Sequence, residues 1–377
     1  MVGGVAPHVT ELAAALARRG HEVHLFARAS GAGESYEIVH DVHIHRVPIE
    51  LDEDFVSECN NMCNSFVWFI RESENFMQAH FDIIHAHDWL AAKTIVQEVV
   101  KKETKVDVDV GKDIKLQKIG RKTILTCHST EFGRCGNTHF DGQAARIRAI
   151  EQEGCDHADR VIAVSGRLCD EVKSLYHCDN KLRMAYNGIQ LHNFDGMIDC
   201  ADVKGRYGIG AFQPTILFVG RLVVQKVKSL ERDREFVVAV AVVWARELNV
   251  GHAVRFLGTM SGTPLKDLLK ATDMVCVPSR NEPFGIVVLE FSLDQAWACG
   301  KPVVVTQSGG PGEFVRHGED GYHVYNEPNS VAWGVKEVFS NFDRAREMGM
   351  RGRDRCEHEF SWDKIAETTE NVYYEVA

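Results

Sequence analysis

The chain has 377 residues, which predicts two domains, because a single hydrophobic core rarely grows beyond about 250–300 residues. Hydrophobic residues make up 45% of the chain and charged residues 26%, the balance of a globular protein. The formal net charge of −11 argues against a nucleic-acid-binding surface, and no run of about 18 apolar residues predicts a transmembrane helix.

The cysteines and the N-terminus bear on the cellular compartment. Eleven cysteines are scattered singly, and the pair Cys59 and Cys63 has no second Cys or His pair at zinc-finger spacing. The N-terminal segment is not a signal peptide, because Pro7, His8 and Glu11 interrupt its apolar stretch. We therefore expect free thiols and a cytoplasmic protein, with an organelle left open because the N-terminus looks incomplete.

The first half of the chain alternates apolar, β-branched segments with helical patterns. A helix is predicted over 9–19, where Gly20 suits the position after a helix end, and a strand is predicted over 21–28. A long helix is predicted over 55–77, and further strands are predicted in VHIHRVPI, FDIIHAH, KTILTCHS, ADRVIAVS and KLRMAYNGI. Strands that alternate with helices indicate βαβ units and a mainly parallel sheet.

A change of pattern separates the two halves. Residues 188–213 are polar and glycine-rich without a clear period, which predicts an interdomain linker. Strand patterns then resume in TILFVGRL, HAVRFLG, DMVCVPS, PVVVTQ and GYHVY. We therefore predict two doubly wound α/β domains, over 1–195 and 213–360.

Polar residues that directly follow strands are candidates for a site, because ligands of open parallel sheets bind beyond the carboxyl ends of the strands. In the first half these include His85, His87, Asp88 and His128. His85 and His87 would share one face of an extended strand, but a metal would need a third ligand, and Asp88 points the other way. We therefore predict no metal site, and His128 alone is more typical of a hydrogen-bonded core residue.

Two further segments could bind phosphate. Gly3 and Gly4 precede the first helix, whose early N–H groups lack partners, although two glycines alone are as typical of a plain turn. Arg221 and Lys226 follow a predicted strand end, where fixed cations would stabilise a departing diphosphate. From this segment alone, two surface cations are the simpler interpretation.

The segment NEPFGIVVLE places Glu282 and Glu290 at the two ends of an apolar run. Pro283 suits a first helical turn, and eight residues of helix would separate the glutamates by about 12 Å. That spacing roughly matches the distance from the sugar to the ribose of a nucleotide-sugar. Two solvated acids on a helix are the alternative, which the apolar surroundings disfavour.

Taken together, these segments resemble the retaining glycosyltransferases of the GT-B fold, in the glycogen- and starch-synthase-like group of the family-four type. The motifs that carry the resemblance span nearly the whole chain: GGVAPHVTELAAALARRGHEVHLF, HAHDWL, CHSTEFGRCGN, ADRVIAVS, NGI, FVGRL, EPFGIVVLE and GKPVVVT. The resemblance implies two Rossmann-like domains that face a cleft. It also implies that a C-terminal helix over 361–377 packs back on the first domain.

The resemblance implies a role for each matched residue. His128 would contact the donor hexose, and Glu282 would hold sugar hydroxyls near the reacting carbon. Arg221 and Lys226 would clamp the diphosphate, and Glu290 would bind the ribose hydroxyls. The expected catalytic residues are His128, Arg221, Lys226 and Glu282; the expected donor-binding residues are Gly3, Gly4, Arg221, Lys226, Phe284, Gly285, Ile286 and Glu290; and the expected acceptor-side residues are His87 and Asp88.

The function implied is transfer of glucose or a related hexose, with retained configuration, from an ADP- or UDP-linked donor to a hydroxyl of a glycan or another acceptor. No metal and no cofactor beyond the donor substrate are expected. An inactive remnant that serves as an interaction module is one alternative, and a nucleotide-sugar epimerase is another. Nucleotide release that depends on an acceptor would exclude the epimerase. The donor, the acceptor and the oligomeric state do not follow from the sequence.

The chain departs from the family pattern in three places. The apolar strand expected before the Gly3 loop is missing, and the segment after Lys226 lacks the expected Gly-Asp-Gly turn. Residues 291–295 look like an insertion that would rotate a continuing helix by about 140°. A missing central strand would leave neighbouring strands unpaired, so we expect the chain as written to be poorly soluble or inactive.

Overall fold

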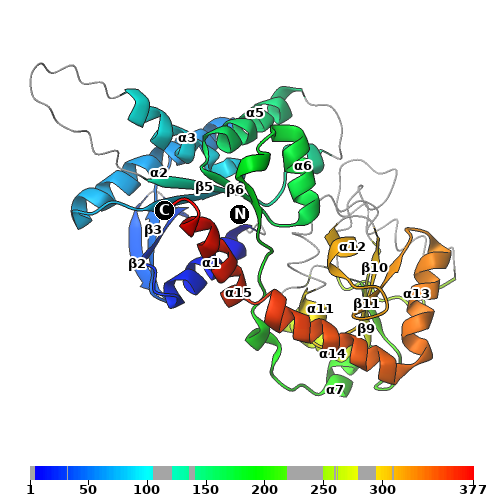
Figure 1. Cartoon of the computed structure of the whole chain (residues 1–377). Coiled ribbons are helices and arrows are strands. Elements are labelled where there is room, and N and C mark those ends of the chain that lie inside the picture. Colours follow the sequence, from blue (N-terminus) through cyan, green and yellow to red (C-terminus); the bar gives the residue numbers. More distant parts are fainter. Residues whose placement is uncertain are drawn as a thin grey trace, which may run out of the picture. The chain divides into compact units, whose positions relative to one another are not determined.

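The computed structural model describes residues 5–31, 33–104, 121–135, 141–218, 249–258, 260, 262–278, 294–307 and 310–377 (Figure 1). The chain divides into two compact units, Met1–Gly188 together with Trp362–Ala377, and Ile189–Ser361. The sequence pattern places the boundaries between domains at 195 and 213. Each unit is described by itself below.

A parallel sheet forms the centre of the first unit. Its strands are β4 (Ile83–His87), β5 (Lys122–Cys127), β6 (Arg160–Ala163) and β7 (Leu182–Met184), hydrogen-bonded in the order β4-β5-β6-β7. Strands of a sheet that is covered on both faces are buried along nearly their whole length, and in β5 only Lys122 is not fully buried. The predicted parallel α/β architecture is confirmed.

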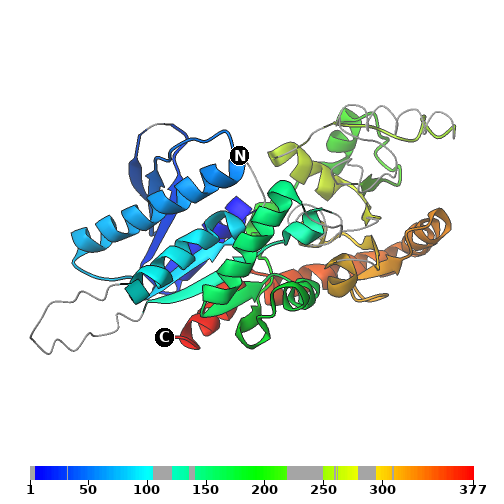
Figure 2. The same ribbon diagram turned by 90° about the horizontal axis from the view of Figure 1, so that it is seen from above.

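Helices cover both faces of this sheet (Figure 2). They are α3 (Asp88–Thr104), α5 (Gly142–His157) and α15 (Trp362–Tyr374). A further helix, α2 (Phe55–Met77), packs against α3 and against two strands of the smaller sheet of this unit. On one face, α5 packs closely, since a Cβ added at Gly154 would lie 2.9 Å from both Leu125 and Ala92. On the other face, Ile124 packs against Val372 of α15. Successive residues of β5 therefore point into two different parts of the core.

A smaller sheet of three strands also belongs to the first unit. It contains β1 (Val23–Arg28), β2 (Ser35–Val39) and β3 (Val42–Val47), in the order β1-β3-β2. β1 and β3 are parallel, whereas β2 and β3 form an antiparallel hairpin whose turn residues His40 and Asp41 have φ values of 51° and 61°. Among the strands that the structure describes, these three form a sheet of their own, separate from β4–β7.

Helix α1 (Val5–Arg18) packs both against the C-terminal helix α15 and against the small sheet. Its apolar residues recur every three or four positions, so they form a stripe along the helix. Leu12 and Leu16 pack in one cluster with Trp362 of α15, and Ala13 packs against Val42 of β3. Helices α1 and α15 accordingly lie side by side (Figure 1).

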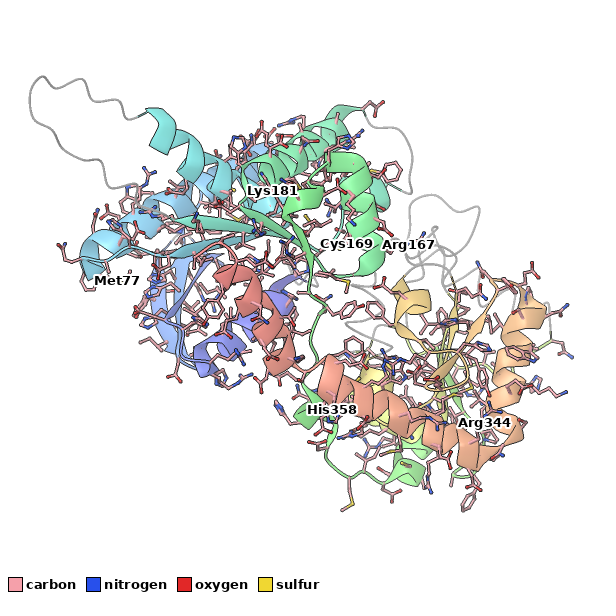
Figure 3. The ribbon with its side chains drawn as sticks, in the orientation of Figure 1. Met77, Arg167, Cys169, Lys181, Arg344 and His358 are labelled. Atoms are coloured by element: carbon pink, nitrogen blue, oxygen red, sulfur yellow. The ribbon has the colours of Figure 1, made fainter. Side chains whose placement is uncertain are left out.

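Further helical segments lie between the strands of the larger sheet along the chain. They are α4 (Glu131–Arg134), α6 (Gly166–Tyr176) and the 3₁₀ turn η1 (Asp179–Lys181). The side chain of Ser165 caps α6, because its Oγ accepts the N–H of Leu168 at 3.1 Å. Arg167 and Cys169 on this helix are labelled in Figure 3.

The second unit is built around another parallel sheet. Its strands are β8 (Ile216–Phe218), β9 (Met274–Val277), β10 (Val303–Thr306) and β11 (Gly321–Val324), in the order β11-β10-β9-β8. Its helices are η2 (Leu191–Phe194), α7 (Cys200–Arg206), α9 (Gly262–Ala271), α11 (Asp294–Ala298), α12 (Gly310–Phe314), α13 (Pro328–Ser340) and α14 (Phe342–Glu359).

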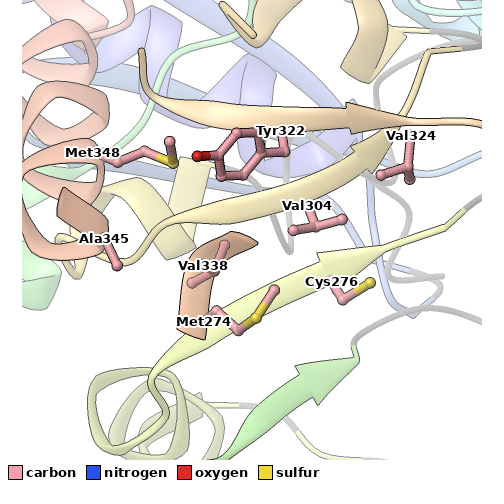
Figure 4. Close-up of a cluster of buried hydrophobic side chains, with 8 residues drawn as sticks. All are labelled: Met274, Cys276, Val304, Tyr322, Val324, Val338, Ala345 and Met348. Carbon is pink, nitrogen blue, oxygen red and sulfur yellow. The ribbon is translucent and has the colours of Figure 1, made fainter. Parts of the chain in front are cut away.

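A core cluster on one face of that sheet holds α13 and α14 in place (Figure 4). Val304 and Tyr322 of the sheet pack there with Val338 of α13 and Met348 of α14. All four side chains are buried, and each buried aliphatic group of this size contributes about 1.5–3 kcal/mol relative to exposure.

The structure of the second unit differs from two of the sequence predictions. Residues 252–258, predicted as a strand, form a turn followed by irregular backbone. Phe256 is 42% exposed there, and Arg255 Nη1 donates to the carbonyl oxygens of His252 and Val254. The segment 188–213, predicted as a linker, contains η2 and α7. No strand within the described ranges pairs with residues 252–258, and strand propensity alone does not make a strand.

No helix in the described ranges is both long enough and apolar enough to span a membrane.

Candidate active site

Two neighbouring strands of the larger sheet bring two predicted site residues together. His87 is the last residue of β4, and His128 directly follows β5. Because parallel strands end at the same edge of a sheet, the two rings meet there, with 3.1 Å between His87 Nδ1 and His128 Nε2. His128 is fully buried, with 0% of its surface exposed.

Two residues that sequence reasoning missed complete this edge. His8 lies on the buried stripe of α1, and its ring centroid is 4.4 Å from that of His128. His8 Nδ1 lies 2.7 Å from Oδ1 of Asn187, which follows β7. We call His8, His87 and His128 the inner histidine cluster. The signal that could have identified His8 is a polar residue on the apolar face of an amphipathic helix.

The three imidazoles of the inner histidine cluster are neutral near pH 7. Burial lowers the pKa of His8 to about 4, and it lowers the pKa of His87 and His128 well below the usual value. Each neutral ring then has one N–H donor and one acceptor nitrogen. Nδ1 of His128 and Nδ2 of Asn187 are buried and have no hydrogen-bond partner among the described residues. Buried polar atoms of this kind are rare and call for a ligand or a water.

Asp88 holds the end of β5 in place. Its Oδ1 accepts the N–H of His128 at 2.7 Å, and the carboxylate also accepts the backbone N–H of Ser129. Asp88 itself has a φ of 56°, in the left-handed region where Asp is one of the more tolerated residues. Burial raises the pKa of Asp88, while the charge of Arg134 and the two N–H groups oppose that shift. Asp88 therefore positions His128 through the backbone.

A second layer of charged residues fixes the loop beyond His128. Arg134 donates from Nη1 to Oγ of Ser129 at 2.6 Å and from Nη2 to Oε1 of Glu151 at 2.9 Å. Glu151 also accepts the N–H of Glu131 at 2.9 Å and the hydroxyl of Tyr176. Burial raises the pKa of Glu151 to about 7. Sequence reasoning missed this network, because its members come from α4, α5 and α6 and have no local motif.

His85 differs from its neighbours on β4. Both of its ring nitrogens have partners, since Nδ1 lies 2.7 Å from the hydroxyl of Tyr373 and Nε2 lies 2.6 Å from Oγ1 of Thr126. Its hydrogen-bonding capacity is used within the fold. His85 therefore has a structural role between β4, β5 and α15.

The inner histidine cluster could hold a metal ion on geometric grounds. His8, His87 and His128 each offer one ring nitrogen, and these nitrogens lie within 4.8 Å of one another. Each ring could be a zinc ligand in its neutral form. The sequence predicts neither a metal nor a cofactor, and that prediction stays a prediction.

All eight predicted donor-binding residues lie outside the described residues, and so does the predicted catalytic residue Glu282. The eight are Gly3, Gly4, Arg221, Lys226, Phe284, Gly285, Ile286 and Glu290. The structure places His87, Asp88 and His128 at one edge of the first unit, and their roles towards donor and acceptor stay predictions.

Comparison with known proteins assigns the sequence to a family. The family model described as Glycosyltransferase Family 4 matches residues 2–193, and the model described as Glycosyl transferases group 1 matches residues 239–355. A glycosyltransferase of Methanocaldococcus jannaschii is 34% identical over 99% of this chain and 94% of its own length. A glycogen synthase of Mycobacterium tuberculosis is 27% identical over 99% of this chain and 91% of its own length.

Comparison with solved structures shows the fold. The sucrose-phosphate synthase of Thermosynechococcus elongatus superposes with a TM-score of 0.75 at 22% identity, and the match covers 100% of this chain and 94% of that one. At this level of identity the likeness concerns the fold alone. The predicted GT-B fold is thereby confirmed.

Proposed function

The chain belongs to glycosyltransferase family 4, and we propose that it is a retaining hexosyltransferase. The proposed donor is glucose or a related hexose linked to ADP or UDP. The proposed acceptor is a hydroxyl of a glycan or of another molecule. The wider statement that the chain is a glycosyltransferase follows from the family itself.

The observation that supports a sugar at this place is Nδ1 of His128, which has no hydrogen-bond partner in the part of the chain that the structure describes. It lies at the carboxyl edge of the parallel sheet, together with the unpartnered Nδ2 of Asn187. A hexose hydroxyl both donates and accepts, so it can pair with a neutral imidazole of either tautomer and with an amide NH₂. Leaving such buried atoms unpaired costs about 1–3 kcal/mol each, which a bound sugar would recover.

We propose that the reaction proceeds on one face of the sugar. The bond from the anomeric carbon to the phosphate oxygen breaks, and the bond to the acceptor oxygen forms. The proton of the acceptor hydroxyl passes to the departing phosphate oxygen. This route requires no nucleophile from the enzyme, and Asp88, whose carboxylate accepts the N–H groups of His128 and Ser129, has a positioning role in it.

The remaining roles rest on the resemblance. Gly3 and Gly4 would approach the diphosphate, and Arg221 and Lys226 would neutralise its growing charge. Glu282 would bind hydroxyls of the hexose, and Glu290 would bind those of the ribose. Phe284, Gly285 and Ile286 would line the donor site.

A screen of donors against acceptors tests the proposed function. The full chain is incubated with ADP-glucose or UDP-glucose, each with and without an α-glucan, a monosaccharide or a polyol phosphate. Free nucleotide and glycosylated product are then measured. From a chain that folds and retains activity despite the missing strand, we expect nucleotide release that requires an acceptor and yields an α-linked product.

Other outcomes of the screen would contradict the proposal. Conversion of the donor into its epimer without an acceptor would indicate an epimerase on the same fold. A β-linked product would overturn the retaining mechanism. A folded chain that binds neither donor nor nucleotide would indicate an interaction module.

A further inference from the structure

A second group of histidines lies on the small sheet of the first unit. His24 of β1 is directly opposite His43 of β3 in the parallel register. Glu22 stands two residues before His24, so its side chain points to the same face of the sheet. We call Glu22, His24 and His43 the outer histidine cluster.

The three side chains of the outer histidine cluster lie close together. The rings of His24 and His43 stack with 4.4 Å between centroids and an interplanar angle of 1°. Oε1 of Glu22 lies 3.1 Å from Nε2 of His24. One ligand atom from each of the three residues lies within 4.8 Å of the others.

We propose that the outer histidine cluster binds one divalent transition-metal ion of the Zn²⁺ class. Two imidazoles and one carboxylate are a ligand set that suits zinc, with water in the fourth position. Two ligand atoms of a tetrahedral zinc ion, each about 2.1 Å from the metal, lie about 3.4 Å apart. The Glu22–His24 pair therefore needs to open by a few tenths of an ångström to admit the ion. The ring of His43 also has to tilt out of its stack on His24, because the lone pair of an imidazole nitrogen lies in the ring plane and two parallel rings do not both point at one ion.

The nitrogens that would not bind the metal already have partners. Nδ1 of His24 lies 3.0 Å from Nε2 of His45, and Nδ1 of His43 lies 2.6 Å from the hydroxyl of Tyr36. If both rings carry their proton on Nδ1, each donates to its partner and presents the lone pair of Nε2 to the ion. Metal-bound histidines almost always donate their other ring N–H in this way, which fixes the tautomer and the orientation of the ring.

Charge and access also favour this position. The side chain of Glu22 is 70% exposed and that of His24 is 6% exposed, so the site opens to solvent on the carboxylate side. The carboxylate offsets one of the two positive charges of the ion. The inner histidine cluster contributes only neutral, buried rings, so a cation there would be costlier to bury.

Titration of the full-length chain with Zn²⁺ at pH 7.5, followed by calorimetry, tests the proposal. We expect one site per chain, with an affinity that falls at least about tenfold in Glu22→Gln and in His43→Ala. Glu22→Gln changes an exposed side chain, so it separates loss of a ligand from loss of the fold. His358→Ala on α14 is the matched control, because His358 is an exposed histidine that is distant in sequence from the outer histidine cluster (Figure 3). This variant should bind Zn²⁺ as the parent does.

The absorption spectrum of bound Co²⁺ tests whether cysteines bind the metal instead. Co²⁺ bound by nitrogen and oxygen ligands shows visible ligand-field bands without the near-ultraviolet bands of thiolate ligation. We expect the nitrogen–oxygen spectrum, and we expect it to be lost in Glu22→Gln/His43→Ala. Equal Zn²⁺ affinity in the parent and in this double variant would overturn the proposal, and so would a thiolate spectrum.

Discussion

The two histidine clusters of the first unit use the same side chain in opposite surroundings. The inner histidine cluster lies at the carboxyl edge of the larger sheet, where burial keeps its three rings neutral. The outer histidine cluster lies on the small sheet beside the exposed carboxylate of Glu22. The difference shows that the neighbours of a histidine decide its chemistry. A dry, neutral ring suits hydroxyl groups, whereas rings beside a carboxylate suit a cation.

The largest expected effect is the loss of stability that His8 causes as the pH falls. Its folded pKa of about 4 lies below the usual 6.5, so its contribution to stability is complete above pH 6.5. That contribution is lost as the pH falls from 6.5 to 4. We expect the difference in unfolding free energy between the parent and His8→Gln to shrink by roughly 3 kcal/mol over this range. Denaturant unfolding at several pH values measures it.

The groups that face His8 sharpen this test. His87 and His128 lie against it from β4 and β5, and Asn187 bonds its Nδ1. His358→Gln changes a fully exposed histidine and should not reproduce the effect. A difference between the parent and His8→Gln that stays constant from pH 7 to pH 4 would show that His8 is not a neutral, dry group.

Substitution of Gly188, next to the inner histidine cluster, should have the next largest effect on the unfolding free energy. A Cβ at Gly188 would lie 2.4 Å from the ring of Trp362, which packs edge-on against His8 at 5.2 Å between centroids. We expect Gly188→Ala to cost about 1–3 kcal/mol, as overpacking does. Gly205→Ala is the control, because Gly205 lies within helix α7 with nothing near its Cβ position, and it should be neutral or stabilising.

Gly188→Ala also tests whether the two clusters are independent. Displacing Trp362 should disturb the inner histidine cluster and leave Zn²⁺ affinity at the outer one unchanged. Thermal unfolding and the Zn²⁺ titration give the two readouts. The expectation fails if the melting temperature is unchanged, or if Zn²⁺ affinity falls together with it.

The smallest effect is expected at Tyr36. Its hydroxyl orients His43 without touching the proposed ion, so Tyr36→Phe should lower Zn²⁺ affinity by about tenfold, the lower end for outer partners of a metal site. Glycosyl transfer should not change. Tyr36 is 55% exposed, so the fold should tolerate the loss of its hydroxyl. Unchanged Zn²⁺ affinity in Tyr36→Phe would show that the Tyr36 hydroxyl does not orient His43 for the ion.

The alternation of strands and helices could be predicted from the sequence, because apolar β-branched runs and helical periods are local signals. The strand predicted over 252–258 was wrong, since pairing depends on a partner strand that local sequence does not specify. His87, Asp88 and His128 could be predicted from the rule that polar residues after parallel strands gather at one edge.

The rest of the described site depends on contacts that are distant in sequence. His8 and Asn187 are hydrogen-bonded although they are 179 residues apart in sequence. Arg134 donates to Glu151 because α4 packs on α5. No motif marks such pairs. The outer histidine cluster likewise arises from the register between β1 and β3, which places His24 opposite His43.

The central claim is that the inner histidine cluster binds the donor hexose, and the turnover of His128→Ala tests it most directly. With the donor and acceptor found in the screen, we expect the rate of transfer to fall about 100-fold or more in His128→Ala, the usual scale for losing one donor that stabilises the transition state. His43→Ala should keep the parent rate. Melting temperatures and circular dichroism show that both variants are folded. A folded His128→Ala chain that turns over at the parent rate would contradict the account.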